Sequence, residues 1–205
     1  YKIKRLTFES QISGQSIQES NKNGEQAKDI FKVNPFISLQ RESLKPKKFT
    51  LNAWYRNSFR IPSFNELYYN NIGNVNLKPE EANQFSLGFT ILPFSKKTGL
   101  KLVVNSFYNE IKNQILALPT KNLFVWSMQN IGKVKNYGFE SRIQLSKVIK
   151  GDWKLNASTN YTLQYALDIS SSTSPTYQHQ VAYMPKHLGN FDINVSYKEI
   201  GFSSS

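Results

Sequence analysis

Residues 152–167 form a long run in which apolar and polar side chains alternate along the chain. One parity carries Trp153, Leu155, Ala157, Tyr161, Leu163 and Tyr165, and the other carries Lys154, Asn156, Ser158, Asn160, Thr162 and Gln164. A period of two residues indicates a β-strand whose two faces meet different surroundings. Strands of soluble proteins are usually about 5 or 6 residues long, whereas about 9 to 11 residues cross a bilayer. The length of this run therefore favours a membrane-crossing strand.

Segments with strand character recur along the whole chain. We expect strands at 2–11, 32–42, 48–60, 82–92, 100–117, 131–147, 152–167 and 181–198. The intervening segments alternate between long ones (12–31, 61–81, 118–130 and 168–180) and short ones (43–47, 93–99 and 148–151). Short periplasmic turns and longer extracellular loops are typical of bacterial outer-membrane barrels. The sequence thus predicts an all-β, antiparallel, up-and-down transmembrane β-barrel arrangement of about eight strands, with both chain ends on the periplasmic side.

Composition excludes several classes of protein. The chain has no cysteine, which rules out disulfide scaffolds, thiol catalysis and cysteine-based zinc sites. No apolar run of about 18 residues provides a transmembrane helix. The net charge of +12 is compatible with nucleic-acid binding, but many lysines fall in the short segments, as Lys45, Lys47, Lys48, Lys96 and Lys97 do. We expect these lysines to face lipid headgroups, and we predict no nucleic-acid partner.

Four ordered motifs resemble the barrel of TonB-dependent outer-membrane receptors. The first runs from Phe59, Arg60, Ile61, Pro62, Ser63 and Phe64 to Leu67 and continues through Gly73 and Asn74 to Leu77, Lys78, Pro79 and Glu80; Val75 replaces the proline usual in the family. The others comprise Phe107, Tyr108, Asn109, Ile111 and Ile115; Asn130, Gly132, Gly138, Phe139 and Glu140; and Tyr183, Pro185 and His187. The resemblance covers roughly residues 48–198.

The resemblance implies a function and a location. Family barrels have about 22 strands and a plug domain, so residues 1–205 are expected to form part of a barrel domain, without a recognisable plug or TonB box. The implied protein is an outer-membrane receptor that takes up a scarce, bulky nutrient such as siderophore-bound iron, haem, a cobalamin or an oligosaccharide. Its expected partners are TonB acting through a plug, outer-membrane lipid, and the nutrient, with a surface lipoprotein as one route of delivery. No enzymatic activity and no cofactor are expected.

Ligand contacts in such a receptor are expected in the extracellular loops and the outer part of the lumen. The candidates are Arg60, Tyr68, Tyr69, Trp126, Tyr177 and His179. Aromatic side chains with polar tips give large contact areas at modest ordering cost. Glu140 and Arg142 are expected to point into the lumen, where they would face the plug or form a local solvated pair. No metal site is predicted, because no second histidine or carboxylate stands at a useful spacing from His179.

Two alternatives remain open at the level of sequence. The chain could form a small complete outer-membrane barrel with hydrolase activity, in which His179 acts as base beside Asp168 and the serines Ser170–Ser172. It could instead be a soluble β-sheet protein that binds polyanions through its lysines. In that case the apolar parity would pack against a second protein layer.

Overall fold

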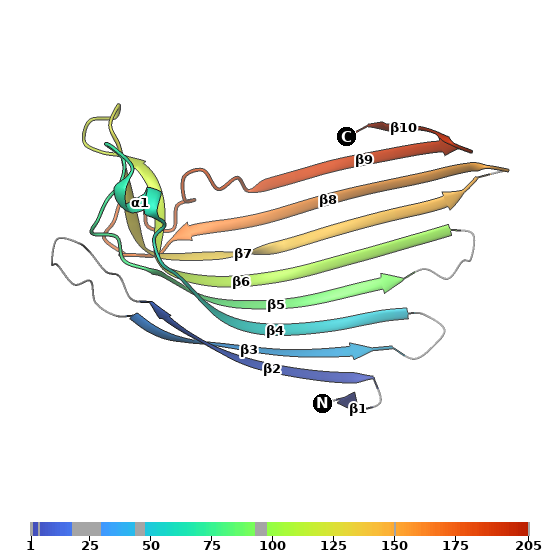
Figure 1. The fold of residues 1–205 in the computed structure, drawn as a ribbon, viewed down its shortest axis with the longest axis horizontal. Coiled ribbons are helices and arrows are strands. Elements are labelled where there is room, and N and C mark those ends of the chain that lie inside the picture. Colours follow the sequence, from blue (N-terminus) through green and yellow to red (C-terminus); the bar gives the residue numbers. More distant parts are fainter. Residues whose placement is uncertain are drawn as a thin grey trace.

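The computed structural model describes residues 2–3, 5–17, 30–43, 48–92, 98–149 and 151–204. They form one antiparallel sheet in which ten strands follow one another in chain order (Figure 1). The strands are β1 (Lys2–Ile3), β2 (Leu6–Ile17), β3 (Ile30–Glu42), β4 (Lys48–Arg60), β5 (Glu80–Leu92), β6 (Thr98–Pro119), β7 (Trp126–Val148), β8 (Trp153–Asp168), β9 (His187–Tyr197) and β10 (Ile200–Ser204). A five-residue helix, α1 (Phe64–Tyr68), lies between β4 and β5. The prediction of an all-β, up-and-down antiparallel arrangement is confirmed.

The register of the sheet places side chains of like character on the same side. Tyr137 of β7, for example, lies directly between Tyr108 of β6 and Tyr165 of β8. We call the side that carries these tyrosines the apolar face; its other members include Ile37, Leu39, Leu51, Phe85, Leu87, Phe89, Leu102, Ile143 and Phe191. The opposite side, the polar face, carries Asn52, Asn105, Glu140, Arg142 and Asn160.

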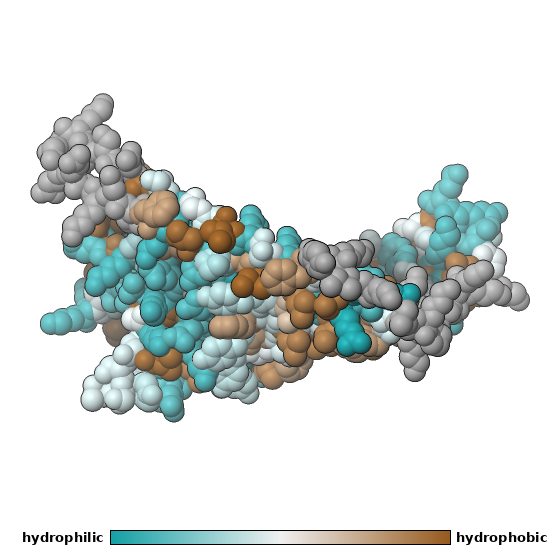
Figure 2. Space-filling view, turned by 90° about the horizontal axis from the view of Figure 1, so that it is seen from below, coloured by the Kyte–Doolittle hydropathy of each residue, from teal (hydrophilic) through white to brown (hydrophobic). Residues whose placement is uncertain are grey.

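No second protein layer covers the apolar face within the part of the chain that the structure describes. Leu87 is 54% exposed and Phe191 is 56% exposed, although both are large apolar side chains. Figure 2 shows hydrophobic residues gathered in the middle of the visible surface, with hydrophilic residues toward both ends. Soluble proteins rarely expose a continuous apolar surface of this extent. The arrangement fits a face turned to lipid. It argues against the soluble alternative, in which a second protein layer would pack against the apolar side chains.

The uncharged part of the apolar face has the height of a bilayer core. On β7 this parity has no charged side chain from Tyr137 to Leu145, and Lys135 and Lys147 flank that stretch. Nine residues at about 3.3 Å each span roughly 30 Å along a strand, or roughly 23 Å across the membrane at a tilt of about 40°. The apolar band of outer-membrane barrels is about 25 Å tall.

Several strands differ from their predicted bounds. The segments 12–17 and 126–130 were predicted to be loops, but they continue β2 and β7, because their polar residues keep pairing beyond the apolar band. β9 begins at His187 and not at residue 181, since residues 182–186 form turns and include Pro185. The strand predicted at 2–11 is divided into β1 and the first part of β2, with Arg5 between them at a φ of 76°. The short strand β10 was not predicted. Of the predicted headgroup-facing lysines, Lys48 begins β4, whereas Lys45, Lys47, Lys96 and Lys97 lie outside the described residues. Among those that are described, no helix has the length and apolar character needed to cross a membrane.

A small core lies on the polar face at the end of the sheet that carries the long loops. Val134, Ala166 and Val181 are buried together there, with Ile111, Ile131 and Met184 packed against them. The backbone N–H of Val181 donates to the carbonyl of Ala166 at 2.7 Å, so the segment after β8 folds back over the strands. This core anchors the loop that follows β8.

Candidate ligand-binding face and outer loops

The loop from residue 61 to residue 79 is held by a network of charges at its base. Ser63 caps α1: its hydroxyl accepts from the Glu66 N–H at 3.4 Å, while the Glu66 carboxylate accepts from the Ser63 N–H at 2.7 Å. Arg60 then bridges two carboxylates, at 2.8 Å from Glu66 and 2.9 Å from Glu80. Since Arg60 ends β4 and Glu80 begins β5, these contacts close the loop where it leaves the sheet.

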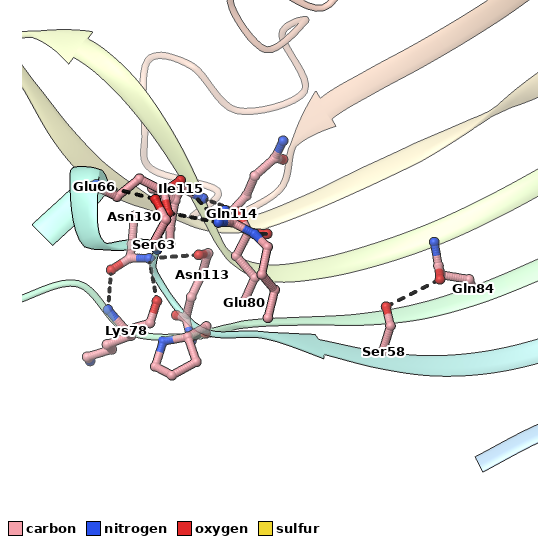
Figure 3. A network of polar contacts seen from close by, with 12 residues as sticks. Ser58, Ser63, Glu66, Lys78, Glu80, Gln84, Asn113, Gln114, Ile115 and Asn130 are labelled. Carbon is pink, nitrogen blue, oxygen red and sulfur yellow. Dashed lines mark hydrogen bonds and ion pairs between the residues drawn. The ribbon is translucent and has the colours of Figure 1, made fainter. Parts of the chain in front are cut away.

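A second set of contacts fastens this loop to the β6–β7 hairpin (Figure 3). The side-chain amide of Asn130 donates to the carbonyls of Lys78, at 2.9 Å, and Asn113, at 2.7 Å, and its oxygen accepts from the Lys78 N–H at 2.8 Å. Asn113 has a φ of 54°, and the β6–β7 pairing is interrupted there. Asparagine tolerates this left-handed conformation better than most residues. The N–H of Ile115 donates to Glu80 at 2.6 Å.

The predicted ligand residues lie in loops or strand ends at one end of the sheet. Tyr68 and Tyr69, at the end of α1, are 52% and 59% exposed. Trp126 opens β7, and its ring lies 5.8 Å from that of Tyr183. Tyr177 and His179 belong to the loop after β8 and have turn hydrogen bonds through their backbone. The Met128 N–H donates to the Ile72 carbonyl at 2.8 Å, which joins the loop at 61–79 to the start of β7.

The two carboxylates that contact Arg60, those of Glu66 and Glu80, both belong to this chain. The guanidinium of Arg60 therefore has a structural role in holding the loop. Contact between Arg60 and a ligand stays a prediction, as it does for the five loop residues. The segments that connect β4 to β5, β6 to β7 and β8 to β9 all lie at this end of the sheet (Figure 1).

Two hollows on the polar face adjoin each other, because Asn105 and Glu140 line both of them. The amide hollow, about 400 Å³ in volume, is lined by Asn52, Trp54, Gln84, Ser86, Asn105, Phe107, Asn109, Asn136, Glu140 and Gln164. The charged hollow, about 660 Å³, is lined among others by Lys101, Asn105, Glu140, Arg142, Asn160 and Asn190. Amides both donate and accept hydrogen bonds, so this lining can match varied polar groups.

Glu140 and Arg142 line the charged hollow together, as their shared parity predicted. The Arg142 guanidinium donates to Asn160 at 2.5 Å, and Asn160 donates to Asn190 at 3.0 Å. Among the described residues, no ion pair joins Glu140 to Arg142. Arg142 therefore hydrogen-bonds to the amides of β8 and β9 and not to Glu140, the local partner considered from the sequence. Contact with a plug stays a prediction.

The sequence reasoning missed the amide hollow. Trp54 and Phe107 stand on the polar parity of their strands, next to Asn52 and Asn105. The sequence signal for this hollow was an aromatic side chain at positions where the alternation predicts a polar one. Gly88 lies between the two asparagines, and a Cβ there would come within 2.2 Å of the Asn52 side chain and 2.4 Å of the Asn105 side chain. Gly88 thus lets the two amides approach each other across β5.

One further amide in this hollow has an unused acceptor. Asn136 is only 9% exposed, and its Oδ1 atom is buried without a hydrogen-bond partner among the residues that the structure describes. A buried polar atom of this kind costs free energy unless something pairs with it. This oxygen is too deeply buried to add an accessible acceptor to the lining formed by the other amides.

The residues considered for hydrolysis do not form a catalytic arrangement. Asp168 accepts from the Ser170 N–H at 2.9 Å and from the Thr176 hydroxyl at 2.6 Å. The Ser170 hydroxyl is engaged by the backbone of Lys133, whose N–H donates to it at 2.9 Å. A nucleophilic serine needs a histidine base within hydrogen-bond reach. Ser170 and Asp168 instead stabilise the loop after β8.

Comparison with known proteins matches residues 15–203 to the family described as "TonB dependent receptor-like, beta-barrel". The vitamin B12 transporter BtuB of Vibrio vulnificus is 35% identical over 83 residues, which cover 40% of this chain and 13% of that protein. The solved structure of the copper transporter OprC superposes with a TM-score of 0.69 at 15% identity, over 98% of this chain and 31% of OprC. The chain thus spans less than a third of the length of these relatives.

The OprC comparison shows the fold, and the family match shows the relationship. Together they confirm the resemblance inferred from the four motifs and the expected outer-membrane location, and they argue against the hydrolase and the soluble polyanion-binding sheet. The chain belongs to the TonB-dependent receptor β-barrel family, whose members are outer-membrane transport proteins and not enzymes.

Proposed function

We propose that this chain contributes part of the wall of an outer-membrane receptor that takes up a scarce, bulky nutrient with energy supplied through TonB. The observation that carries the proposal is the contrast between the two faces of one sheet. The apolar face is uncovered over the height of a bilayer core, while the polar face carries the amide and charged hollows. In a barrel wall these faces would meet lipid and an aqueous lumen.

The chemistry of the polar face favours an organic nutrient or chelate with many polar groups. Asn52 and Asn105 offer both hydrogen-bond donors and acceptors, and Trp54 and Phe107 offer flat apolar surface beside them. Ligand sites commonly combine aromatic surface with a few placed polar groups. Siderophore-bound iron, haem, a cobalamin and an oligosaccharide all fit this description. BtuB is a vitamin B12 transporter and OprC a copper transporter, so the relatives point to different nutrients.

The outer loops would make the first contact with the nutrient. Arg60 and Asn130 hold the loop at 61–79 in place, which presents Tyr68 and Tyr69 on a fixed support. A preorganised loop loses less conformational freedom on binding than a mobile one. The proposed order is capture by Tyr68, Tyr69, Trp126, Tyr177 and His179, followed by passage along the polar face after TonB acts on a plug. Delivery by a surface lipoprotein is compatible with this order.

Growth of a strain that lacks the whole gene tests the proposal. The strain is supplied in turn with a ferric siderophore, haemin, cyanocobalamin or an oligosaccharide as the limiting nutrient. We expect a selective growth defect on one of them, restored by the intact gene only when TonB is present. Normal growth on all four, or rescue that does not depend on TonB, would contradict it.

A matched pair of variants links the transport to the polar face. Trp54→Ala removes an aromatic side chain from the amide hollow, whereas Tyr55→Ala removes one from the apolar face at the next residue. We expect Trp54→Ala to lower uptake at equal surface abundance and Tyr55→Ala to leave uptake per receptor unchanged. Equal effects would show that the polar face has no special part in transport.

A further inference from the structure

Two lysines on the apolar face stand over a row of tyrosine rings near the long-loop end of the sheet. The Lys135 ammonium lies 5.4 Å from the ring centre of Tyr108 and 5.2 Å from that of Tyr137. Lys186 lies 5.4 Å from the ring centre of Tyr165, which stacks on Tyr137 at 5.5 Å. The two ammonium groups therefore lie over a row of three tyrosine rings from β6, β7 and β8. We call Tyr108, Tyr137 and Tyr165 the tyrosine platform.

In a barrel wall whose apolar face meets lipid, as proposed above, this platform would lie at the depth of the outer headgroups. The tyrosines end the uncharged stretch of the apolar face, and Lys135 is two residues further toward the long loops. Two residues correspond to about 5 Å across the membrane at the usual strand tilt. Tyrosine rings are enriched at the boundary between hydrocarbon and headgroups, and lysines extend past that boundary to the polar layer.

The local charge is positive and partly unpaired. Glu110, which lies directly opposite Lys135 in the register, forms its ion pair with Lys133 instead. Within the described part of the chain, neither Lys135 nor Lys186 forms an ion pair with a carboxylate. Cation–π contacts hold an ammonium group in place without neutralising it. Both charges thus stay available to an anion.

We propose that Lys135 and Lys186, on the Tyr108–Tyr137–Tyr165 platform, bind the phosphate groups of a phosphorylated glycolipid in the outer leaflet. A lipid is the partner that fits, because the acyl chains would lie against the exposed apolar face directly below the platform. Basic residues beside a membrane attract anionic headgroups, and lysine is a common phosphate ligand. The site would tie the receptor to lipid of the outer leaflet and is separate from the nutrient path on the polar face.

The whole gene product in detergent micelles allows a direct test by native mass spectrometry and by lipid titration of thermal unfolding. The probes are an acylated glucosamine disaccharide with its phosphates, the same glycolipid after phosphatase treatment, and inorganic phosphate alone. We expect the phosphorylated glycolipid to bind and to raise the unfolding temperature, and the other two probes to do so far less. Equal binding of the dephosphorylated glycolipid, or equal stabilisation by inorganic phosphate, would overturn the proposal.

Variants assign the binding to the two lysines. Since each lysine near an anionic surface contributes about 1 kcal/mol, Lys135→Gln and Lys186→Gln should each weaken binding about fivefold, and the double variant roughly 25-fold. Lys101→Gln is the matched control, because it removes the same charge from the charged hollow on the polar face. Lys135→Arg should retain binding. An equal loss in Lys101→Gln, or none in the double variant, would overturn the proposal; heat-modifiable electrophoretic mobility confirms that each variant is folded.

Discussion

An arginine placed on either face of β7 should have very different effects on stability. Ile143 faces the apolar side, between Leu102 and Thr159, while the next residue, Gln144, faces the polar side. Both substitutions introduce the same charge at nearly the same depth. Only Ile143→Arg would place the guanidinium against hydrocarbon.

The size of the effect follows from the depth of Ile143. The uncharged stretch of β7 runs from Tyr137 to Leu145 and is centred on Ser141, two residues from Ile143. Ile143 therefore lies about 5 Å from the midplane at the usual strand tilt. Arginine on the lipid face costs about 2–4 kcal/mol at the midplane and less toward the interfaces. We expect Ile143→Arg to destabilise the folded state by about 2–3 kcal/mol and Gln144→Arg by less than about 0.5 kcal/mol.

Guanidinium titration of the whole gene product folded in phospholipid vesicles measures the difference. The folded fraction is read from the heat-modifiable shift in electrophoretic mobility, and the same samples are compared in short-chain and long-chain lipid. The midpoint for Ile143→Arg should fall clearly below that of the unmodified protein, while Gln144→Arg stays close to it. Equal midpoints for the two variants would refute the assignment of the faces.

Three further predictions concern the strand contacts and the loop at 61–79. Gly138→Ala should destabilise the folded protein by about 1–3 kcal/mol, because the new Cβ would come within 1.9 Å of a carbonyl oxygen on β8. Gly99→Ala, whose new Cβ would be 3.5 Å from its nearest neighbour, should be tolerated in the same guanidinium titration. Asn130→Ala removes two hydrogen bonds to Lys78 in the loop and one to Asn113 in β6, and should weaken docking of the loop by roughly 1–3 kcal/mol. Faster cleavage at 61–79 in limited proteolysis would report this loss, whereas an unchanged cleavage rate would count against the docking role. Burial opposes ionisation of Glu66, but hydrogen bonds from Arg60 and Ser63 outweigh it and hold the pKa of Glu66 below its ordinary value of 4.5. This contribution to loop stability is present at neutral pH. It is lost as the pH falls below 4.5 and through the lower pKa that Glu66 has in the folded state. Cleavage of the loop by an acid protease should therefore accelerate over this pH range, and it should accelerate less in Glu66→Gln.

The architecture could be predicted from sequence because the membrane imposes a strict pattern on each strand. Alternation at 152–167 identifies β8 almost to its ends, since every second side chain must suit lipid. The outer ends of β2, β6 and β7 could not be predicted in the same way. Beyond the apolar band both faces meet water, so residues such as Ser13 and Gly14 look like loop residues although they pair with β3.

The site was harder to predict than the fold because its contacts join distant segments. The sequence identified Arg60 and Glu80 within one motif, but the additional ion pair from Arg60 to Glu66 depends on how α1 folds back. Nothing local in the sequence shows that Asn130 holds Lys78, 52 residues away. The amide hollow likewise depends on the register that brings Asn52, Gly88 and Asn105 side by side.

The central claim is that one face of the sheet meets hydrocarbon and the other meets an aqueous lumen. Single cysteines are introduced one at a time from Leu155 to Tyr165 of this cysteine-free chain. They are labelled with a nitroxide in the membrane-embedded whole gene product, in which any cysteine outside this chain has been replaced by serine. Collision rates with oxygen, which concentrates in lipid, and with a water-soluble nickel chelate should alternate with a period of two and in opposite phase, with odd-numbered positions exposed to lipid. Collision rates without this alternation, or nickel access at every position, would contradict the account.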